Sequence, residues 1–99
     1  MDLRVGTIVA ADKHPDADKL LVFLVKMGTE QRQIVSGVAP YYAPEELLGK
    51  KVVVLANLAP RKIRGVESKG MILFADNEVN GETRYEYITT VAEDGNPVM

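Results

Sequence analysis

Cysteine is absent from this chain of 99 residues, and histidine occurs only once, at His14. Without cysteine there is no disulfide framework and no thiolate metal site. Acyl transfer needs a nucleophile beside a base, usually histidine, and the one histidine here lies in a turn with Pro15 in a chain without cysteine. Turn-forming roles for Asp12, Asp16 and Asp18 are favoured over a metal cluster, because no second His or Cys completes one. The sequence therefore predicts a non-catalytic domain with no cofactor, no metal and no small-molecule substrate.

Long apolar runs are missing as well. The longest, Leu20 to Val25, is far shorter than the roughly 20 residues that cross a bilayer, and the N-terminus has no apolar run like that of a signal peptide. With the absence of cysteine, these features predict a cytoplasmic protein without a membrane partner. The length fits one domain over residues 1–99.

Net charge is small, but the charged residues are unevenly distributed. The formal net charge is only -2, yet six basic residues and one acidic residue lie between Lys50 and Lys69. That segment is at +5 and the remainder of the chain is at -7. Such asymmetry can attract an anionic partner to one face of a protein. A solvated lysine-rich turn is the alternative interpretation.

Short apolar segments separated by turn residues predict a strand-rich, all-β fold. The predicted strands cover residues 3–11, 20–27, 31–36, 51–56, 70–75 and 85–91. A brief helix is predicted to begin at Pro44 and end before Gly49. Residues 76–81 read as an exposed turn, and the tail from residue 93 to 99 as loosely ordered. Five strands with a small helix between the third and fourth predict an oligonucleotide-binding (OB) barrel over residues 2–75, with residues 76–99 as a C-terminal extension and candidate dimer element.

The stretch from Ala56 to Met71 is predicted to be a long surface loop, and loops of that length are usually functional. Its basic side chains can reach phosphate oxygens, and its amide and hydroxyl groups can bond base edges, 2′-hydroxyls or the loop backbone. Met71 is predicted either to carry an unstacked base or to pack in the core. The candidate nucleic-acid contacts are Asn57, Arg61, Lys62, Arg64, Ser68, Lys69 and Met71.

Six blocks in order carry a family resemblance: residues 2–6, 14–20, 33–37, 41–47, 57–62 and 65–73. Over residues 2–75 the chain resembles the tRNA-binding domain of bacterial methionyl-tRNA synthetases and of stand-alone dimeric tRNA-binding proteins. The resemblance implies an OB barrel that binds tRNA largely by shape, a homodimer, and no catalytic activity in this domain. It also implies tRNA contact by Asn57, Arg61, Lys62, Ser68 and Met71. Arg64 and Lys69 are added from their charge and position.

The predicted function is therefore an auxiliary module, appended at the C-terminus of a methionine–tRNA ligase, that binds tRNA to assist aminoacylation. Both ends look trimmed beside the family, which predicts a piece of a longer synthetase. The alternative is a homodimerisation or protein-interaction module with little RNA binding. A chaperone-like branch of the family is less similar, because the His14–Lys19 and Pro60–Lys62 blocks follow the synthetase pattern.

Overall fold

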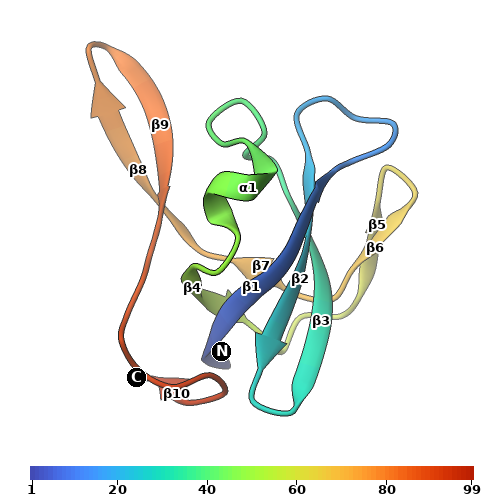
Figure 1. The fold of residues 1–99 in the computed structure, drawn as a ribbon, viewed down its shortest axis with the longest axis vertical. Helices are drawn as coiled ribbons and strands as arrows, with labels where there is room; N and C mark the ends of the chain where they lie inside the picture. The colour runs from blue at the N-terminus through green and yellow to red at the C-terminus, as the bar shows by residue number, and fades with distance from the viewer.

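In the computed structural model, which describes residues 1–99, the chain is built almost entirely from strands (Figure 1). The elements are β1 (Leu3–Lys13), β2 (Leu21–Met27), β3 (Glu30–Ser36), α1 (Pro44–Leu47), β4 (Lys51–Leu55), β5 (Arg61–Ile63), β6 (Val66–Ser68), β7 (Met71–Ile72), β8 (Phe74–Val79), β9 (Glu82–Tyr87) and β10 (Pro97–Val98). No helix is long and apolar enough to cross a membrane.

Strand β1 is the longest and lies at the centre of the main sheet. Its first half pairs antiparallel with β4 and its second half with β2, and Thr7 is paired with both Lys51 and Lys26. The register shifts between Ile8 and Ala10. A bulge of this kind bends a strand and increases its twist. Strand β1 therefore pairs first with β4 and then with β2, and the sheet curls at the bulge.

The curled sheet has the order β3-β2-β1-β4-β7, and the chain just before β7 reaches back to β3. The Lys69 amide donates to the Gln33 carbonyl at 2.8 Å, and the Val35 amide donates to Ser68 Oγ at 3.0 Å. Helix α1 lies between β3 and β4, as the sequence predicts, and the Glu46 carboxylate accepts from the amide before its first turn. The predicted all-β, OB-like barrel with one short helix is confirmed.

The barrel interior is filled by the inward-facing residues of these strands. In β2, Leu21, Phe23 and Val25 are fully buried while the residues between them are partly exposed, as expected for a strand with one face on a core. Their partners in the core include Ile8, Ile34, Leu47, Val52, Val54 and Ile72. This packing builds the barrel from which the loops and hairpins project.

The predicted exposed turn at residues 76–81 is wrong. Residues 76–79 belong to β8, which pairs with β9 in a separate two-stranded sheet, and only Asn80 and Gly81 turn the chain. Their φ angles of 53° and 81° are those of a type I′ hairpin turn, for which Asn-Gly is the favoured pair. The further strand accordingly covers 82–87 rather than 85–91, and the strand predicted at 70–75 divides into β7 and the start of β8.

The tail is not loose, contrary to the sequence-based expectation. Strand β10 pairs with the start of β1, with Val98 opposite Leu3. The Asp94 carboxylate accepts a hydrogen bond from Thr7 Oγ1 at 2.7 Å. Polar composition suggested disorder, but these polar groups are satisfied by β1, which has an edge free to receive them.

Candidate nucleic-acid interface

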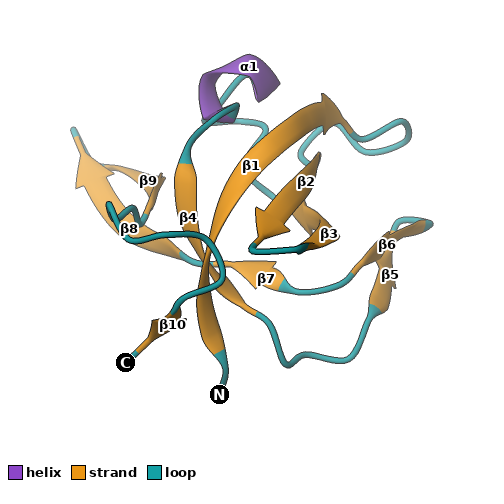
Figure 2. Ribbon diagram, turned by 60° about the horizontal axis from the view of Figure 1, so that its bottom comes forward, coloured by secondary structure: helices purple, strands orange, loops and turns teal.

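The predicted loop between residues 56 and 71 is a small β-hairpin. Strands β5 and β6 pair through three residues each, and the hairpin stands out from the barrel in Figure 2. Its turn is formed by Arg64 and Gly65, whose φ angles are 51° and 88°, again a type I′ turn. Both Arg61 and Lys62 are exposed, and neither belongs to any of the ion pairs in the chain. Their charges are therefore available to a ligand.

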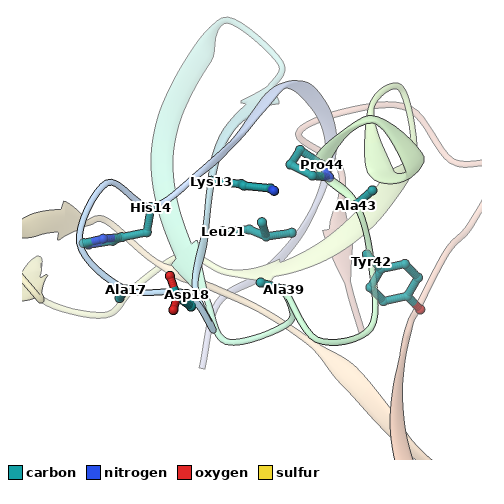
Figure 3. A pocket seen from close by; sticks show the side chains of 9 residues that line it. All are labelled: Lys13, His14, Ala17, Asp18, Leu21, Ala39, Tyr42, Ala43 and Pro44. Carbon is teal, nitrogen blue, oxygen red and sulfur yellow. The ribbon is translucent and has the colours of Figure 1, made fainter.

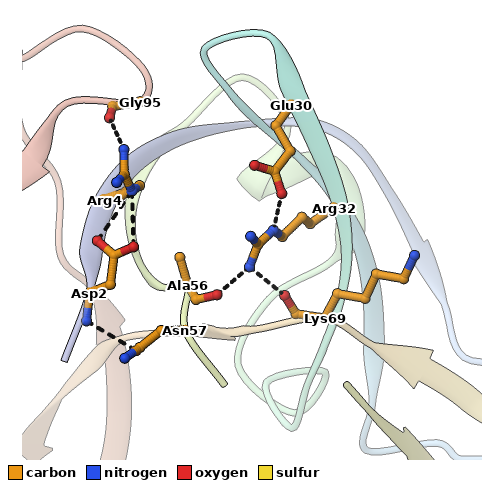
Figure 4. A network of polar contacts seen from close by, with 8 residues as sticks. All are labelled: Asp2, Arg4, Glu30, Arg32, Ala56, Asn57, Lys69 and Gly95. Carbon is orange, nitrogen blue, oxygen red and sulfur yellow. Dashed lines mark hydrogen bonds and ion pairs between the residues drawn. The ribbon is translucent and has the colours of Figure 1, made fainter. Parts of the chain in front are cut away.

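The other exposed candidates surround this hairpin. The Arg64 guanidinium donates to the Asp16 carbonyl at 3.4 Å. Lys69 Nζ lies 3.7 Å from a carboxylate oxygen of Glu67 on β6, and both side chains are about half exposed. Met71 is 48% exposed, so it lies on the surface rather than in the core. Asn57 is exposed, and its Oδ1 accepts from the Asp2 amide at 3.0 Å (Figure 4).

Ser68 is the buried member of the predicted set, with 2% of its surface exposed. Its Oγ accepts from the Val35 amide at 3.0 Å and donates to the Gly70 carbonyl at 3.1 Å. Both capacities of the hydroxyl are thus used within the protein. In this structure Ser68 fastens β6 to β3 and supports the hairpin from below.

The structure divides the basic segment read from the sequence. Lys50 and Lys51 lie at the far end of β4 from Ala56, where the hairpin segment begins. Lys51 faces the tail, donating to the Ala92 carbonyl and lying 3.8 Å from the Asp94 carboxylate. The concentrated positive charge therefore belongs to the hairpin and the residue that follows it.

The tip of the hairpin is held by the loop between β1 and β2. His14 is 5% exposed, with Nε2 at 3.1 Å from the Ile63 carbonyl oxygen and Nδ1 accepting from the Asp16 amide at 3.0 Å. The imidazole consequently carries its proton on Nε2 and donates it to Ile63. Sequence reasoning identified His14 only as a turn residue, because nothing in the chain indicates which distant segment it touches.

Lys19 is a further basic residue that sequence reasoning missed. It lines a hollow with Ile63 and Arg64, between the β1–β2 loop and the hairpin tip. Two aspartates beside it mask its charge in any count along the chain. The position of the β1–β2 loop in an OB barrel is the one signal that could have indicated it, since that loop borders the ligand face.

The base of the hairpin is held by Arg32 of β3, which sequence reasoning also missed (Figure 4). The guanidinium is paired with the Glu30 carboxylate on the same strand. Its Nη1 donates to the carbonyl of Ala56 and, at 3.2 Å, to the carbonyl of Lys69. Those two residues stand at the beginning and the end of the hairpin segment.

A separate cavity of about 460 Å³ opens at the end of the barrel near α1 (Figure 3). His14 and Asp18 line it from the β1–β2 loop, and Tyr42 lines it from the segment before α1. Both His14 nitrogens are bonded to backbone groups, so this imidazole is committed to holding the loop and the hairpin tip.

Tyr42 connects the barrel to the second hairpin, β8–β9. Its hydroxyl lies 3.0 Å from both the Tyr85 carbonyl oxygen and Glu86 Oε2, and the Arg84 guanidinium lies 5.1 Å from its ring centroid. Burial raises the pKa of Tyr42 above the usual value for tyrosine, and the hydrogen bond to Glu86 adds to that effect. The neutral phenol is thus the form that the fold favours.

An OB-like barrel with an exposed basic hairpin beside its β1–β2 loop is the arrangement of an oligonucleotide-binding domain. Residues 3–97 match the model of the family described as "Putative tRNA binding domain". The chain belongs to this tRNA-binding domain family.

Its most similar relatives include long synthetase chains. The chain is 58% identical over 77 residues to the methionine–tRNA ligase of Christiangramia forsetii and 60% identical over 77 residues to that of Flavobacterium johnsoniae. Each alignment covers 78% of this chain and 11% of the relative. The chain thus spans about a tenth of the length of the curated relatives it matches.

Solved structures show the same fold. A MetRS-related protein from Pyrococcus horikoshii superposes with a TM-score of 0.90 at 36% identity, over 99% of this chain and 89% of that one. The C-terminal domain of Plasmodium vivax p43 gives 0.84 at 30% identity, over 99% and 59%. The chaperone CsaA of Bacillus anthracis gives 0.80 at 22% identity, over 99% and 90%, a likeness that concerns the fold alone.

Proposed function

We propose that this chain is a non-catalytic module that binds tRNA for a methionyl-tRNA synthetase. The observation that carries the proposal is the β5–β6 hairpin, which presents Arg61 and Lys62 to solvent without internal partners. Arginine binds a phosphate through a two-pronged fork and lysine as a point charge. The module raises the concentration of tRNA near a catalytic domain on the same chain.

The proposed contacts follow the OB ligand face, where the β1–β2 loop and the loop after β4 bind oligonucleotides. Arg61, Lys62, Arg64 and Lys69 supply the phosphate contacts. Asn57 and Met71 flank them, offering an amide and an apolar surface for ribose or an unpaired base. Ser68 enters the site indirectly, by holding the hairpin strand from inside. Because most of these contacts go to the backbone of the nucleic acid, recognition depends on shape more than on base sequence.

The test is a titration of unfractionated tRNA at two salt concentrations. Arg61→Glu/Lys62→Glu is expected to abolish binding, and wild-type affinity is expected to fall with salt, with a logarithmic slope of about 0.7 to 0.9 per phosphate contact. Lys62→Glu and Lys50→Glu form a matched pair, since both lysines are exposed and carry the same charge change. Only the first is expected to weaken binding. An affinity that does not respond to salt would sink the proposal.

A second candidate role is homodimerisation through the C-terminal extension, residues 76–99. The observation in its favour is the β8–β9 hairpin, a two-stranded sheet whose outer edges are unpaired and thus open to strand pairing. Val79 at its tip is 48% exposed and Ile88 after it is 40% exposed. Light scattering after gel filtration tests this role: Val79→Lys/Ile88→Lys should convert a dimer to a monomer, whereas a monomeric wild type excludes it.

A further inference from the structure

Arg32 is the one side chain that bonds to both ends of the hairpin segment. Its Nη1 donates to the carbonyl of Ala56, where the chain leaves β4, and to that of Lys69, where it leaves β6. Gln33 and Ser68 each fasten only the second end to β3. The β4–β7 pairing, in which Leu55 lies opposite Met71, brings the two ends together, and the Arg32 guanidinium bridges them just beyond that pairing.

The chemistry of this position requires arginine. A guanidinium is planar and offers five donors in fixed directions, so it can bond a carboxylate and two carbonyls at once. The Glu30 carboxylate holds the Arg32 group from its own strand. A lysine would keep the charge but could not keep this arrangement, because its donors converge on one small ammonium group.

We propose that Arg32 is the positioning residue of the tRNA-binding hairpin. It bridges the two strand ends and so fixes where the hairpin presents Arg61 and Lys62, and it does not itself bind tRNA. The inference rests on the proposed function. Its side chain is only 23% exposed, its Nε donates to the Glu30 carboxylate and its Nη1 donates to two backbone carbonyls, which separates it from the free cations of the hairpin.

Positioning and direct contact leave different signatures in a salt titration. A residue that binds a phosphate contributes to the slope of log affinity against log salt, and its removal lowers that slope by about 0.7 to 0.9. A residue that positions others lowers the affinity at every salt concentration and leaves the slope nearly unchanged. A conservative lysine preserves a charge contact but does not preserve a bridge.

The experiment compares Arg32→Met and Arg32→Lys with the wild type, using unfractionated tRNA across a salt series. Both variants are expected to bind about tenfold more weakly, the loss of one charge-assisted hydrogen bond, with an unchanged slope. Arg84→Met is the matched control. Arg84 also pairs with a carboxylate two residues along its strand and donates to a distant carbonyl, that of Tyr41, yet it lies on the other hairpin. The Arg84→Met variant should bind tRNA as the wild type does.

Each remaining outcome has one meaning. Arg32 variants that bind as the wild type does overturn the inference. Full rescue by Arg32→Lys, with a lower slope for Arg32→Met, makes Arg32 a phosphate contact and also overturns it. Should Arg32→Met fail to fold, the test uses Arg32→Lys and the hydrogen exchange of the Ile63 amide. Positioning predicts that Arg32→Lys speeds this exchange relative to the wild type and leaves the exchange of the β2 amides unchanged. A wild type that binds no tRNA contradicts the proposed function. Failure of the inference about Arg32 is a different result, in which the wild type binds tRNA and the Arg32 variants bind it equally well.

Discussion

Two hairpins leave the barrel on opposite sides, and they are attached in different ways (Figures 1 and 2). Strands β5 and β6 have three residues each and are held at their base and tip by hydrogen bonds to backbone carbonyls, from Arg32 and His14. Strands β8 and β9 have six residues each. They are attached by all four tyrosines of the chain, with ring pairs Tyr41–Tyr85 at 5.3 Å and Tyr42–Tyr87 at 6.3 Å.

The two attachments show two ways in which a surface hairpin without a core of its own can be fixed to a barrel. Isolated two-stranded hairpins are marginally stable in water, so each of these depends on the barrel. Packed aromatic rings supply stabilisation through their large buried area and edge-to-face contacts. Hydrogen bonds to chosen carbonyls supply less free energy but define position within narrow limits. Position is what a charged hairpin needs if its cations are to meet phosphates.

The largest effect is expected where the aromatic attachment is removed. Tyr42→Ala should lower the free energy of unfolding by about 3 to 5 kcal/mol, because a buried aromatic ring and its hydroxyl contacts are lost. Urea denaturation followed by circular dichroism measures it. Tyr42→Phe, which keeps the ring, should cost about 1 kcal/mol. Equal losses in the two variants would contradict the view that the ring is the main attachment.

A smaller effect is expected at the tip of the other hairpin. His14→Phe retains the ring volume but removes the bonds to Ile63 and Asp16, so the free energy of unfolding should fall by about 1 to 2 kcal/mol. The affinity of the folded variant for tRNA should fall about fivefold, because the hairpin tip is released. This fall is counted after correction for the smaller folded fraction. Unchanged tRNA affinity in a folded variant would mean that the tip needs no fixing.

The two turns provide a matched comparison. Arg64 and Asn80 both have positive φ, a conformation that costs an ordinary residue about 1 to 2 kcal/mol and asparagine less. Asn80→Ala should therefore lower the free energy of unfolding by about 1 kcal/mol, whereas Arg64→Asn should not lower it. Thermal unfolding of both variants measures the difference. A destabilising Arg64→Asn would show that the contact with Asp16 outweighs the backbone strain.

The smallest effect concerns alkaline pH. Because the folded pKa of Tyr42 is raised, the unfolded chain loses this proton first, at about pH 10. The stabilisation is complete below that pH and is lost as the pH rises through the folded pKa. Tyr42→Phe should remove this part of the decline, as measured by urea titrations between pH 8.5 and 11. A decline as steep in the variant as in the wild type would assign it to other groups.

Much of the barrel was predictable, because the short apolar runs Leu20–Val25 and Val52–Leu55, bounded by turn residues, are local signals of strands. The hairpin at 80–81 was predictable too, since Asn-Gly is the strongest short hairpin signal, but the polar residues before it were taken for a turn. The hairpin at 61–68 has only a weak signal, as arginine rarely occupies the first turn position. The contacts of Arg32 and His14 were beyond sequence reasoning, because they join residues 24 and 49 positions apart.

The double pairing of β1 also bears on how fast the molecule forms. Leu3 lies opposite both Leu55 and Val98. Two partners of the central strand β1 are therefore synthesised much later than β1 itself. The meander β1–β2–β3 can form from neighbouring residues, but closure waits for the stretch around Lys69. Folds dominated by such distant pairings reach the native state in milliseconds to seconds rather than microseconds. A ribosome adds about 5 to 20 residues per second. During synthesis the β1–β2–β3 meander would therefore stay open until the closing segment is made, and the rate of synthesis would limit the folding of this domain.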